Sequence, residues 1–139
     1  NPIYALLVLV GFVLVASLHV ATAYVERRRD RSSNEPSEGW CDVGSIEEIP
    51  MNRAKIVVVA GGERVAVFRH EEGISAVTNV CAHQRGPIGE GKIVDGCITC
   101  PWHGWQYRPH DGQSPPPFTE KIATYPVRVS DGRVLIEPR

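Results

Sequence analysis

Two pairs of cysteine and histidine stand close together in this 139-residue sequence. Cys81-Ala82-His83 is followed, after sixteen residues, by Cys100-Pro101-Trp102-His103. Each pair offers one soft thiolate and one imidazole, so two facing loops can present two thiolates to one iron and two imidazoles to a second. The pattern predicts a cluster held by Cys81, His83, Cys100 and His103 that exchanges single electrons.

The ligand pairs lie in a stretch, residues 80–118, that is poor in strand-forming residues and rich in glycine and proline. Glycines such as Gly86 and Gly104 allow tight turns and a close approach of the backbone to a cluster. Loops of this composition cannot build a hydrophobic core of their own. We therefore expect a bound metal centre to fix them.

Zinc is the alternative for the same four residues. Structural zinc sites place about two to four residues between paired cysteines and three to five between paired histidines, and the Cys81-Ala82-His83 pair is too short for that habit. Cys97 and Cys100 also form a CxxC pattern, but residues three apart on a strand face opposite sides. We interpret Cys97 and Cys41 as buried core residues, and His70 and His110 as ordinary solvated histidines.

The chain from Trp40 onward has the pattern of an antiparallel β domain. Short runs rich in Val, Ile and Thr alternate with Gly, Asp, Asn and Pro, and Gly61-Gly62 and Asp131-Gly132 are favoured hairpin turns. The fold class is therefore all-β, a sandwich or barrel with no convincing helix in this region. The expected strands are 41–43, 55–59, 64–69, 74–79, 93–99, 123–129 and 134–137.

The N-terminal segment is of a different kind. Ile3 to Val25 is a run without charge, and as a helix it would be roughly 35 Å long, enough to cross a hydrocarbon layer of about 30 Å. Residues 26–39 are charged and small and include one proline, which is typical of a linker. We expect a transmembrane helix at 1–25, a flexible charged linker at 26–39 and the β domain at 40–139.

The charges next to the helix predict its orientation. Four arginines at positions 27, 28, 29 and 31 follow the helix and no basic residue precedes it, so the positive-inside rule places the β domain on the cytoplasmic side of the membrane. The nearly even balance of 15 basic and 16 acidic residues argues against nucleic acid as a partner. His19 lies inside the apolar run, where a packing or interfacial role competes with ligation of a haem.

The paired ligand motif resembles the Rieske signature, in which two Cys and two His hold a 2Fe-2S cluster. The likeness extends over Trp40 to Pro138 and includes the EGKIVDG connection at 90–96 and the Ser114-Pro115-Pro116-Pro117 stretch. The resemblance implies an antiparallel β-sandwich that carries a small cluster-binding subdomain and one Rieske cluster per chain. It also implies that a proline-containing loop at 115–117 covers the cluster.

Departures from one branch of the family narrow the expectation. Rieske proteins of cytochrome bc complexes carry an additional Cys in each ligand loop, paired as a disulfide, where this chain has Gly86 and Trp102. They also carry a Ser that donates to a cluster sulfide where this chain has Trp105, whereas Tyr107 matches their phenol. The chain is thus more similar to Rieske ferredoxins and oxygenase ferredoxin domains, and fewer donors to sulfur predict a low-potential cluster.

These observations predict a membrane-anchored one-electron carrier that passes electrons between a redox donor and a redox acceptor, with no substrate chemistry on this chain. One alternative is the C-terminal Rieske part of a larger polytopic membrane oxidoreductase, in which His19 would ligate a haem. A quinol-oxidising bc-type Rieske subunit is a weaker alternative. A catalytic Rieske oxygenase would need a further iron held by two His and a carboxylate, for which few candidates remain.

Overall fold

The computed structural model describes residues 1–32 and 39–138, with the side chains of 26–32 left out. The chain divides into two compact units, Asn1–Glu35 and Pro36–Arg139.

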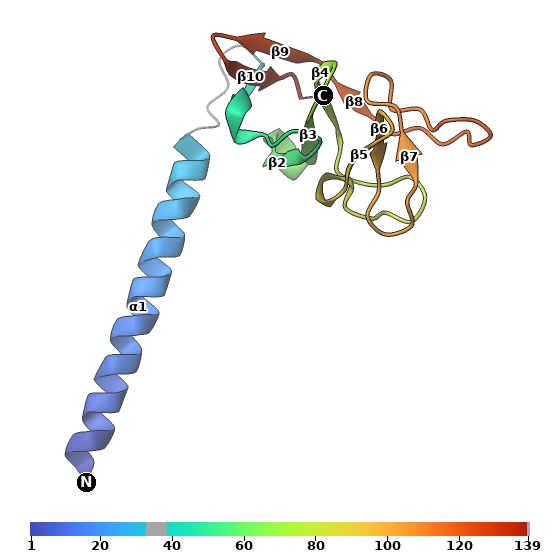
Figure 1. The fold of residues 1–139 in the computed structure, drawn as a ribbon. Helices are drawn as coiled ribbons and strands as arrows, with labels where there is room; N and C mark the ends of the chain where they lie inside the picture. Colours follow the sequence, from blue (N-terminus) through green and yellow to red (C-terminus); the bar gives the residue numbers. More distant parts are fainter. Residues whose placement is uncertain (33–38, 139) are drawn as a thin grey trace. The chain divides into compact units, whose positions relative to one another are not determined.

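The first unit is a single helix, α1 (Pro2–Ser32), drawn in blue in Figure 1. Its apolar part, Pro2–Val25, is by length and composition a candidate membrane span. The helix continues to Ser32, seven residues into the segment expected to be a linker. The rest of that segment, 33–38, lies outside the described residues. Within α1 the Nδ1 atom of His19 lies 2.9 Å from the carbonyl oxygen of Val15.

The second unit consists of three antiparallel sheets with short 3₁₀ turns between strands (Figure 1), as the fold class predicted. The first sheet has the order β1 (Cys41–Ser45), β10 (Arg133–Ile136), β9 (Val127–Ser130). The second has the order β2 (Ala54–Val58), β3 (Arg64–His70), β4 (Gly73–Thr78), β8 (Thr124–Tyr125). The third and smallest has the order β5 (Lys92–Val94), β6 (Cys97–Thr99), β7 (Gln106–Tyr107).

Strand β3 is buried on both faces and separates two hydrophobic cores. Side chains alternate along a strand, so Val65 and Val67 pack into a core shared with the β1–β10–β9 sheet. Ala66 and Phe68 pack into a second core that contains Cys81 and Cys100. The first core also buries Cys41, which confirms the expectation for that residue. The second core is therefore the base on which the ligand loops rest.

Two of the expected strands are each divided in the structure. The run 93–99 was expected as one strand, but Asp95 and Gly96 have φ of 50° and 75° and form the turn of a β5–β6 hairpin. Positive φ at two successive residues reverses the chain. Pro126 separates β8 from β9, because proline lacks the N–H that a central ladder requires. Strand β7, only two residues long, was not expected.

The hairpin turn predicted at Asp131-Gly132 is confirmed. These residues have φ of 50° and 75° and connect Ser130 to Arg133, which pair across β9 and β10. Gly61 and Gly62, with φ of 84° and 81°, likewise lie between the paired strands β2 and β3. At both places the local sequence determines the turn, since few residues other than glycine, asparagine and aspartate accept positive φ.

Candidate iron–sulfur site

The two ligand pairs lie on loops that have the same backbone hydrogen bonds. In the first loop the N–H of Cys81 donates to Gly86 (2.9 Å) and the N–H of Arg85 donates back to Cys81 (2.8 Å). In the second loop the N–H of Cys100 donates to Trp105 (2.8 Å) and the N–H of Gly104 donates back to Cys100 (3.0 Å). Each loop is thus a closed turn that begins at a cysteine and presents its histidine two or three residues later.

Both loops start from sheet strands, which fix their positions. The first follows β4, and the carbonyl oxygen of the Asn79 side chain anchors it by accepting from the N–H of Gly89 (2.6 Å). The second follows β6, so that the small sheet carries it. The turn in each loop requires a left-handed residue at its fifth position, where Arg85 has φ of 60° and Gly104 has φ of 71°.

The two thiols are buried side by side. Cys81 and Cys100 are 1% and 2% exposed and belong to the same core. Burial raises the pKa of the Cys100 thiol; the backbone N–H groups of Trp102 and His103 lower it, and a hydrogen bond with Cys81 raises it. A β-carbon on Gly86 would lie 3.0 Å from the Cys100 Sγ, so glycine at this position lets the loops approach each other.

The two imidazoles lie together at the surface. The rings of His83 and His103 meet edge to face, with centroids 5.1 Å apart, and both residues are exposed. Trp105 stacks on His83 with a centroid distance of 4.3 Å and an interplanar angle of 6°. Trp105 also contacts Phe118, the residue that follows the three prolines, with a centroid distance of 4.5 Å.

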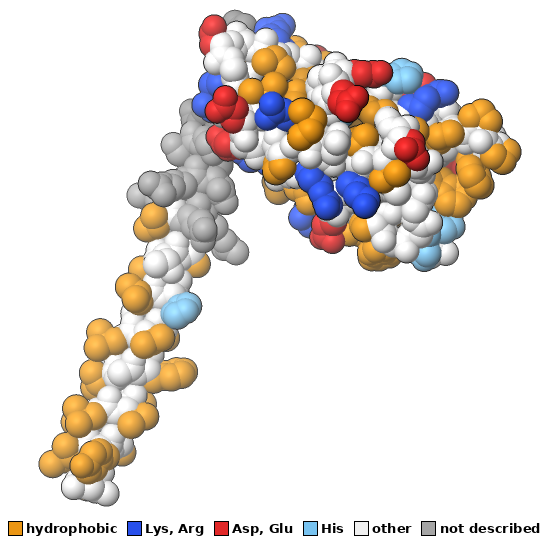
Figure 2. Space-filling model, in the orientation of Figure 1, with side chains coloured by type: hydrophobic (Ala, Val, Ile, Leu, Met, Phe, Trp, Pro, Cys, Tyr) orange, Lys and Arg blue, Asp and Glu red, His pale blue; other side chains and the backbone are white. Residues whose placement is uncertain are grey.

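We call the surface formed by 81–86, 100–105 and 115–118 the histidine tip. Trp102 and Phe118 are 58% and 50% exposed there. Figure 2 shows orange apolar side chains on the outermost loop of the domain, with pale-blue histidine next to them. The sequence places Trp102 and Trp105 within two residues of His103. It gave no signal for Phe118, because an aromatic residue after a proline run has no fixed place until the loop is folded.

A phenol connects the strand β7 to the first ligand loop. The Tyr107 hydroxyl lies 3.2 Å from the Cys81 Sγ and accepts from the N–H of Ala82 at 3.0 Å. Burial, followed by the contact with Cys81, raises the pKa of Tyr107 above its ordinary value. The phenol therefore stays protonated and can donate to a ligand sulfur.

The donor set of two thiols and two imidazoles fits a cluster of two irons. Among the residues that the structure describes, no three His, Cys, Asp or Glu side chains are grouped so that they could hold one metal ion. A buried thiol pair beside an exposed imidazole pair is what two irons with two protein ligands each require. Two buried polar atoms of these described segments, the Trp105 Nε1 and the Ser114 Oγ, have no hydrogen-bond partner. Trp105 is the last residue of the second ligand loop, and Ser114 precedes the three prolines that follow it in the sequence.

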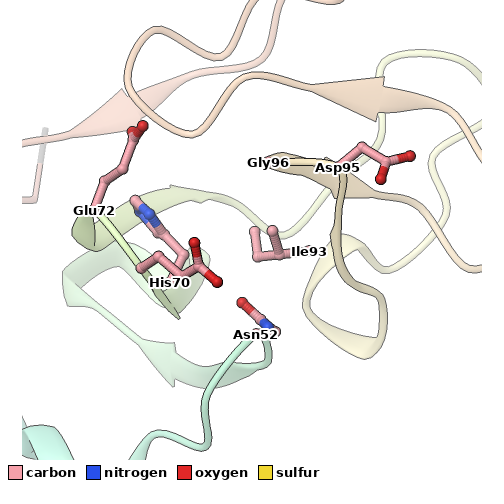
Figure 3. Close-up of a pocket in the computed structure, with 7 residues that line it drawn as sticks. Asn52, His70, Glu72, Ile93, Asp95 and Gly96 are labelled. Atoms are coloured by element: carbon pink, nitrogen blue, oxygen red, sulfur yellow. The ribbon is translucent and has the colours of Figure 1, made fainter.

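Two predicted spectator residues differ in part from expectation. Cys97 is half-buried and outside both cores, because it faces away from the buried Ile98 side of β6. His70 is also half-buried, 2.8 Å from the Ser75 hydroxyl, rather than solvated, whereas His110 is exposed as expected. His70 lines a hollow of about 310 Å³ with Asn52, Glu71, Glu72, Ile93, Asp95 and Gly96 (Figure 3). This hollow shares no residue with the ligand loops.

The positions that carry a disulfide in bc-type proteins are occupied differently here. They are Gly86 and Trp102, and the ring of Trp102 lies 3.0 Å from the β-carbon position of Gly86. The indole thus packs directly against the glycine, and the two ligand loops are held together by this contact.

Comparison with known proteins agrees with this geometry. The model of the Rieske [2Fe-2S] domain matches residues 39–126. The ferredoxin subunit of anthranilate 1,2-dioxygenase from Burkholderia cepacia is 33% identical over 98 residues, which cover 70% of this chain and 90% of that protein. The ferredoxin of carbazole 1,9a-dioxygenase from Nocardioides aromaticivorans has the same fold, with a TM-score of 0.67, 21% identity, and coverage of 73% of this chain and 100% of that one.

A second kind of relative is much longer than this chain. Cholesterol 7-desaturase from Hemicentrotus pulcherrimus is 30% identical over 125 residues, covering 86% of this chain and 26% of that protein. The chain therefore spans almost the whole length of the ferredoxin relatives but about a quarter of the desaturase. Since the family model matches more than half of the chain, this protein belongs to the Rieske [2Fe-2S] family, and its β domain carries a Rieske-type 2Fe-2S cluster.

Proposed function

We propose that this chain is a membrane-anchored one-electron carrier whose cluster is held by Cys81 and Cys100 on one iron and by His83 and His103 on the other. The observation that supports it best is the pairing of two buried thiols with two exposed imidazoles on matched loops. When bound, a Rieske cluster takes up and releases one electron at a time.

The residues around the ligands have separate tasks. The core beneath Cys81 and Cys100 excludes water from the thiolates, and Tyr107 donates to the Cys81 sulfur. Trp105 covers one face of His83. The exposed edges of the His83 and His103 rings, the histidine edge, are open to solvent. A redox partner that docks on the histidine tip therefore approaches the imidazoles directly.

The partner class follows from the relatives. The matches to the ferredoxin components of anthranilate and naphthalene dioxygenase systems cover 90% and 97% of those proteins. We therefore propose that this carrier delivers electrons to an oxygenase-type acceptor after it receives them from a reductase. Trp105 has no hydroxyl group that could donate to a cluster sulfide as the Ser of bc-type proteins does. This supports a reduction potential toward the reducing end of the Rieske range, about −150 mV.

The helix supports a membrane location. Residues Pro2–Val25 form a candidate span, and the arginines that follow it in the sequence support a cytoplasmic β domain. Protease added to sealed vesicles with the cytoplasmic face inside should leave the domain intact, whereas inverted vesicles should lose it.

A second candidate function is a part of a longer Rieske oxygenase or desaturase. The similarity to the Hemicentrotus desaturase covers 86% of this chain, more than the β domain alone can supply, so it reaches into the N-terminal segment. In that case a mononuclear iron on another part of the protein would carry out the substrate chemistry. Iron analysis of the purified native protein separates the two proposals, because the carrier requires two irons per polypeptide and the oxygenase three.

Purification under argon, followed by iron, acid-labile sulfide and electron paramagnetic resonance measurements, tests the carrier. We expect two irons and two sulfides per chain and a signal that appears only after one-electron reduction. His103→Ala and Cys100→Ser should abolish the signal. Their matched controls, His110→Ala and Cys97→Ser, replace the same residue types away from the ligand set and should retain it. A colourless wild-type protein that contains zinc would refute the proposal.

A further inference from the structure

Arg85 occupies a backbone conformation that suits glycine. It is the fifth residue of the first ligand loop and has φ of 60°. The equivalent residue of the second loop, with the same hydrogen bonds, is Gly104 with φ of 71°. A side chain in this left-handed region costs roughly 1 kcal/mol or more. Folding alone would therefore favour glycine at position 85.

The Arg85 side chain has no internal task that offsets this cost. It is exposed, and no hydrogen bond, ion pair or ring contact links it to another part of the described chain. By contrast, Arg108 pairs with Asp111 at 2.6 Å and Arg133 with Asp42 at 2.6 Å. Backbone strain that gives no structural return is characteristic of functional positions.

The surroundings of Arg85 are apolar. Arg85 is the only Lys, Arg, Asp or Glu residue of the histidine tip. The rest of the tip is formed largely by alanine, glycine, proline and aromatic residues. Trp102 is 58% exposed and Phe118 is 50% exposed. A surface that covers the tip must therefore be mostly apolar and must provide one negative group for the guanidinium, since a buried unpaired charge is costly.

We propose that Arg85 is a docking cation that determines which redox protein reaches the histidine edge. The fitting partner presents an apolar contact surface with a carboxylate opposite Arg85, which the planar guanidinium can bind in a bidentate manner. This inference rests on the proposed electron-carrier function and adds the chemistry of the partner's contact surface. Arg85 acts on association and orientation and leaves the cluster itself unchanged.

Two small one-electron oxidants of opposite charge test this in the full-length holoprotein. Reduced protein in detergent is mixed anaerobically with tris(oxalato)cobaltate(III), a trianion that displays carboxylates, or with tris(bipyridine)cobalt(III), a trication. At an ionic strength of about 0.01 M, Arg85→Gln should slow oxidation by the anion by about threefold to tenfold and should not slow oxidation by the cation. Any change in cluster potential affects both oxidants alike, so the ratio of the two rates isolates docking.

Matched variants complete the test. Arg85→Lys should restore most of the ratio, and Arg128→Gln, which removes an exposed charge from β9 on another sheet, should leave it at the wild-type value. Arg85→Gly should also lower the ratio while unfolding at an equal or higher temperature than wild type, because it relieves the strained backbone. A structural role for Arg85 would instead make Arg85→Gly less stable.

The outcomes distinguish the two proposals. A protein without two irons and two sulfides, or without one-electron reduction, refutes the carrier function before any oxidant is added. An intact cluster with the same rate ratio in wild type and Arg85→Gln refutes the docking inference alone. It is also refuted if vesicles with phosphatidylserine slow oxidation by the anion in wild type and not in Arg85→Gln, because Arg85 would then bind the lipid surface.

Discussion

At the scale of single residues, the site is built from a few side chains that contact one another closely. Tyr107 lies 3.2 Å from the Cys81 sulfur, Gly86 leaves room for the Cys100 sulfur, and Trp105 lies flat on His83. Each of these contacts involves an atom that the cluster would also touch. Substitutions here should therefore change the redox centre more than the fold.

Removal of the Tyr107 hydroxyl should make the cluster more reducing. A hydrogen bond to a ligand sulfur stabilises the reduced, more negative cluster, and its loss, at about 1 kcal/mol, corresponds to a fall of about 40 mV for a one-electron couple. We expect this shift in Tyr107→Phe by potentiometric titration. The control is Tyr125→Phe, which removes a β8 hydroxyl that bonds to Glu63. This variant should keep the wild-type potential. Equal potentials in all three proteins would contradict the prediction.

A methyl group at position 86 should force the ligand loops apart. The added carbon of Gly86→Ala would lie 3.0 Å from both the Cys100 Sγ and the Trp102 Cδ2, and overpacking of this kind costs roughly 1–3 kcal/mol. We expect a lower unfolding temperature and faster loss of the visible absorption on dilution. The double variant Gly86→Ala/Trp102→Leu removes one of the two clashes and should recover part of the loss. No difference between Gly86→Ala and wild type would show that the loops can move freely.

At the scale of elements, the two faces of β3 pack into different hydrophobic cores. Val65 and Val67 support the core beneath the β1–β10–β9 sheet, whereas Ala66 and Phe68 support the core that holds the two ligand cysteines. The ligand loops leave from β4 and β6 and close on this second core. Their geometry is thus determined by the packing of strands that contribute no ligand.

Core substitutions on the two sides should have separable effects. Phe68→Ala empties a fully buried position and should destabilise the domain by about 3–5 kcal/mol, with broadened resonance lines from the loosened cluster. Val134→Ala opens a cavity in the other core and should cost about 2 kcal/mol with an unchanged resonance spectrum. Chemical unfolding and electron paramagnetic resonance on the same samples compare them. An altered spectrum in Val134→Ala would show that the two cores are not independent.

At the scale of the whole molecule, the chain combines a β domain, which contains both ligand loops, with an apolar helix. The helix side chains are all exposed through Val25. An exposed apolar surface of this size requires a partner, either a lipid bilayer or other helices. The two units have separate internal packing. Attachment to a membrane and electron transfer should therefore be separable by mutation.

Loss of the helix should release the protein and preserve the cluster. A chain that begins at Glu26 should stay at the bottom of a liposome flotation gradient, with the same iron and sulfide content as the full-length protein, which should float. Leu14→Arg places a charge near the centre of the span, which costs about 2.5–3.5 kcal/mol on insertion scales, and should weaken flotation. Leu14→Ala is the matched control and should float like wild type. Flotation of the shortened chain would locate membrane binding in the β domain.

Local sequence was enough to predict a large part of this protein. The spacing of Cys81, His83, Cys100 and His103 predicted the cluster, the uncharged run after Ile3 predicted the helix, and Asp131-Gly132 predicted a hairpin. These features depend on residue chemistry, length and the φ preference of single residues, which neighbours in the chain determine. The sequence failed where a short strand needs a partner to exist, as at β7, and where two turn residues divide a strand, as at Asp95-Gly96.

Only the tertiary structure decided how distant segments meet. Trp105 reaches His83, Phe118 contacts Trp105, and Tyr107 reaches Cys81 because segments that leave two different sheets pack on one core. The likeness between Arg85 and Gly104 likewise appears only from hydrogen bonds and φ angles that no motif encodes. Such contacts depend on the packing of strands far apart in the sequence, so the sequence alone could propose four ligands, whereas the aromatic and phenolic side chains around them could be identified only from the structure.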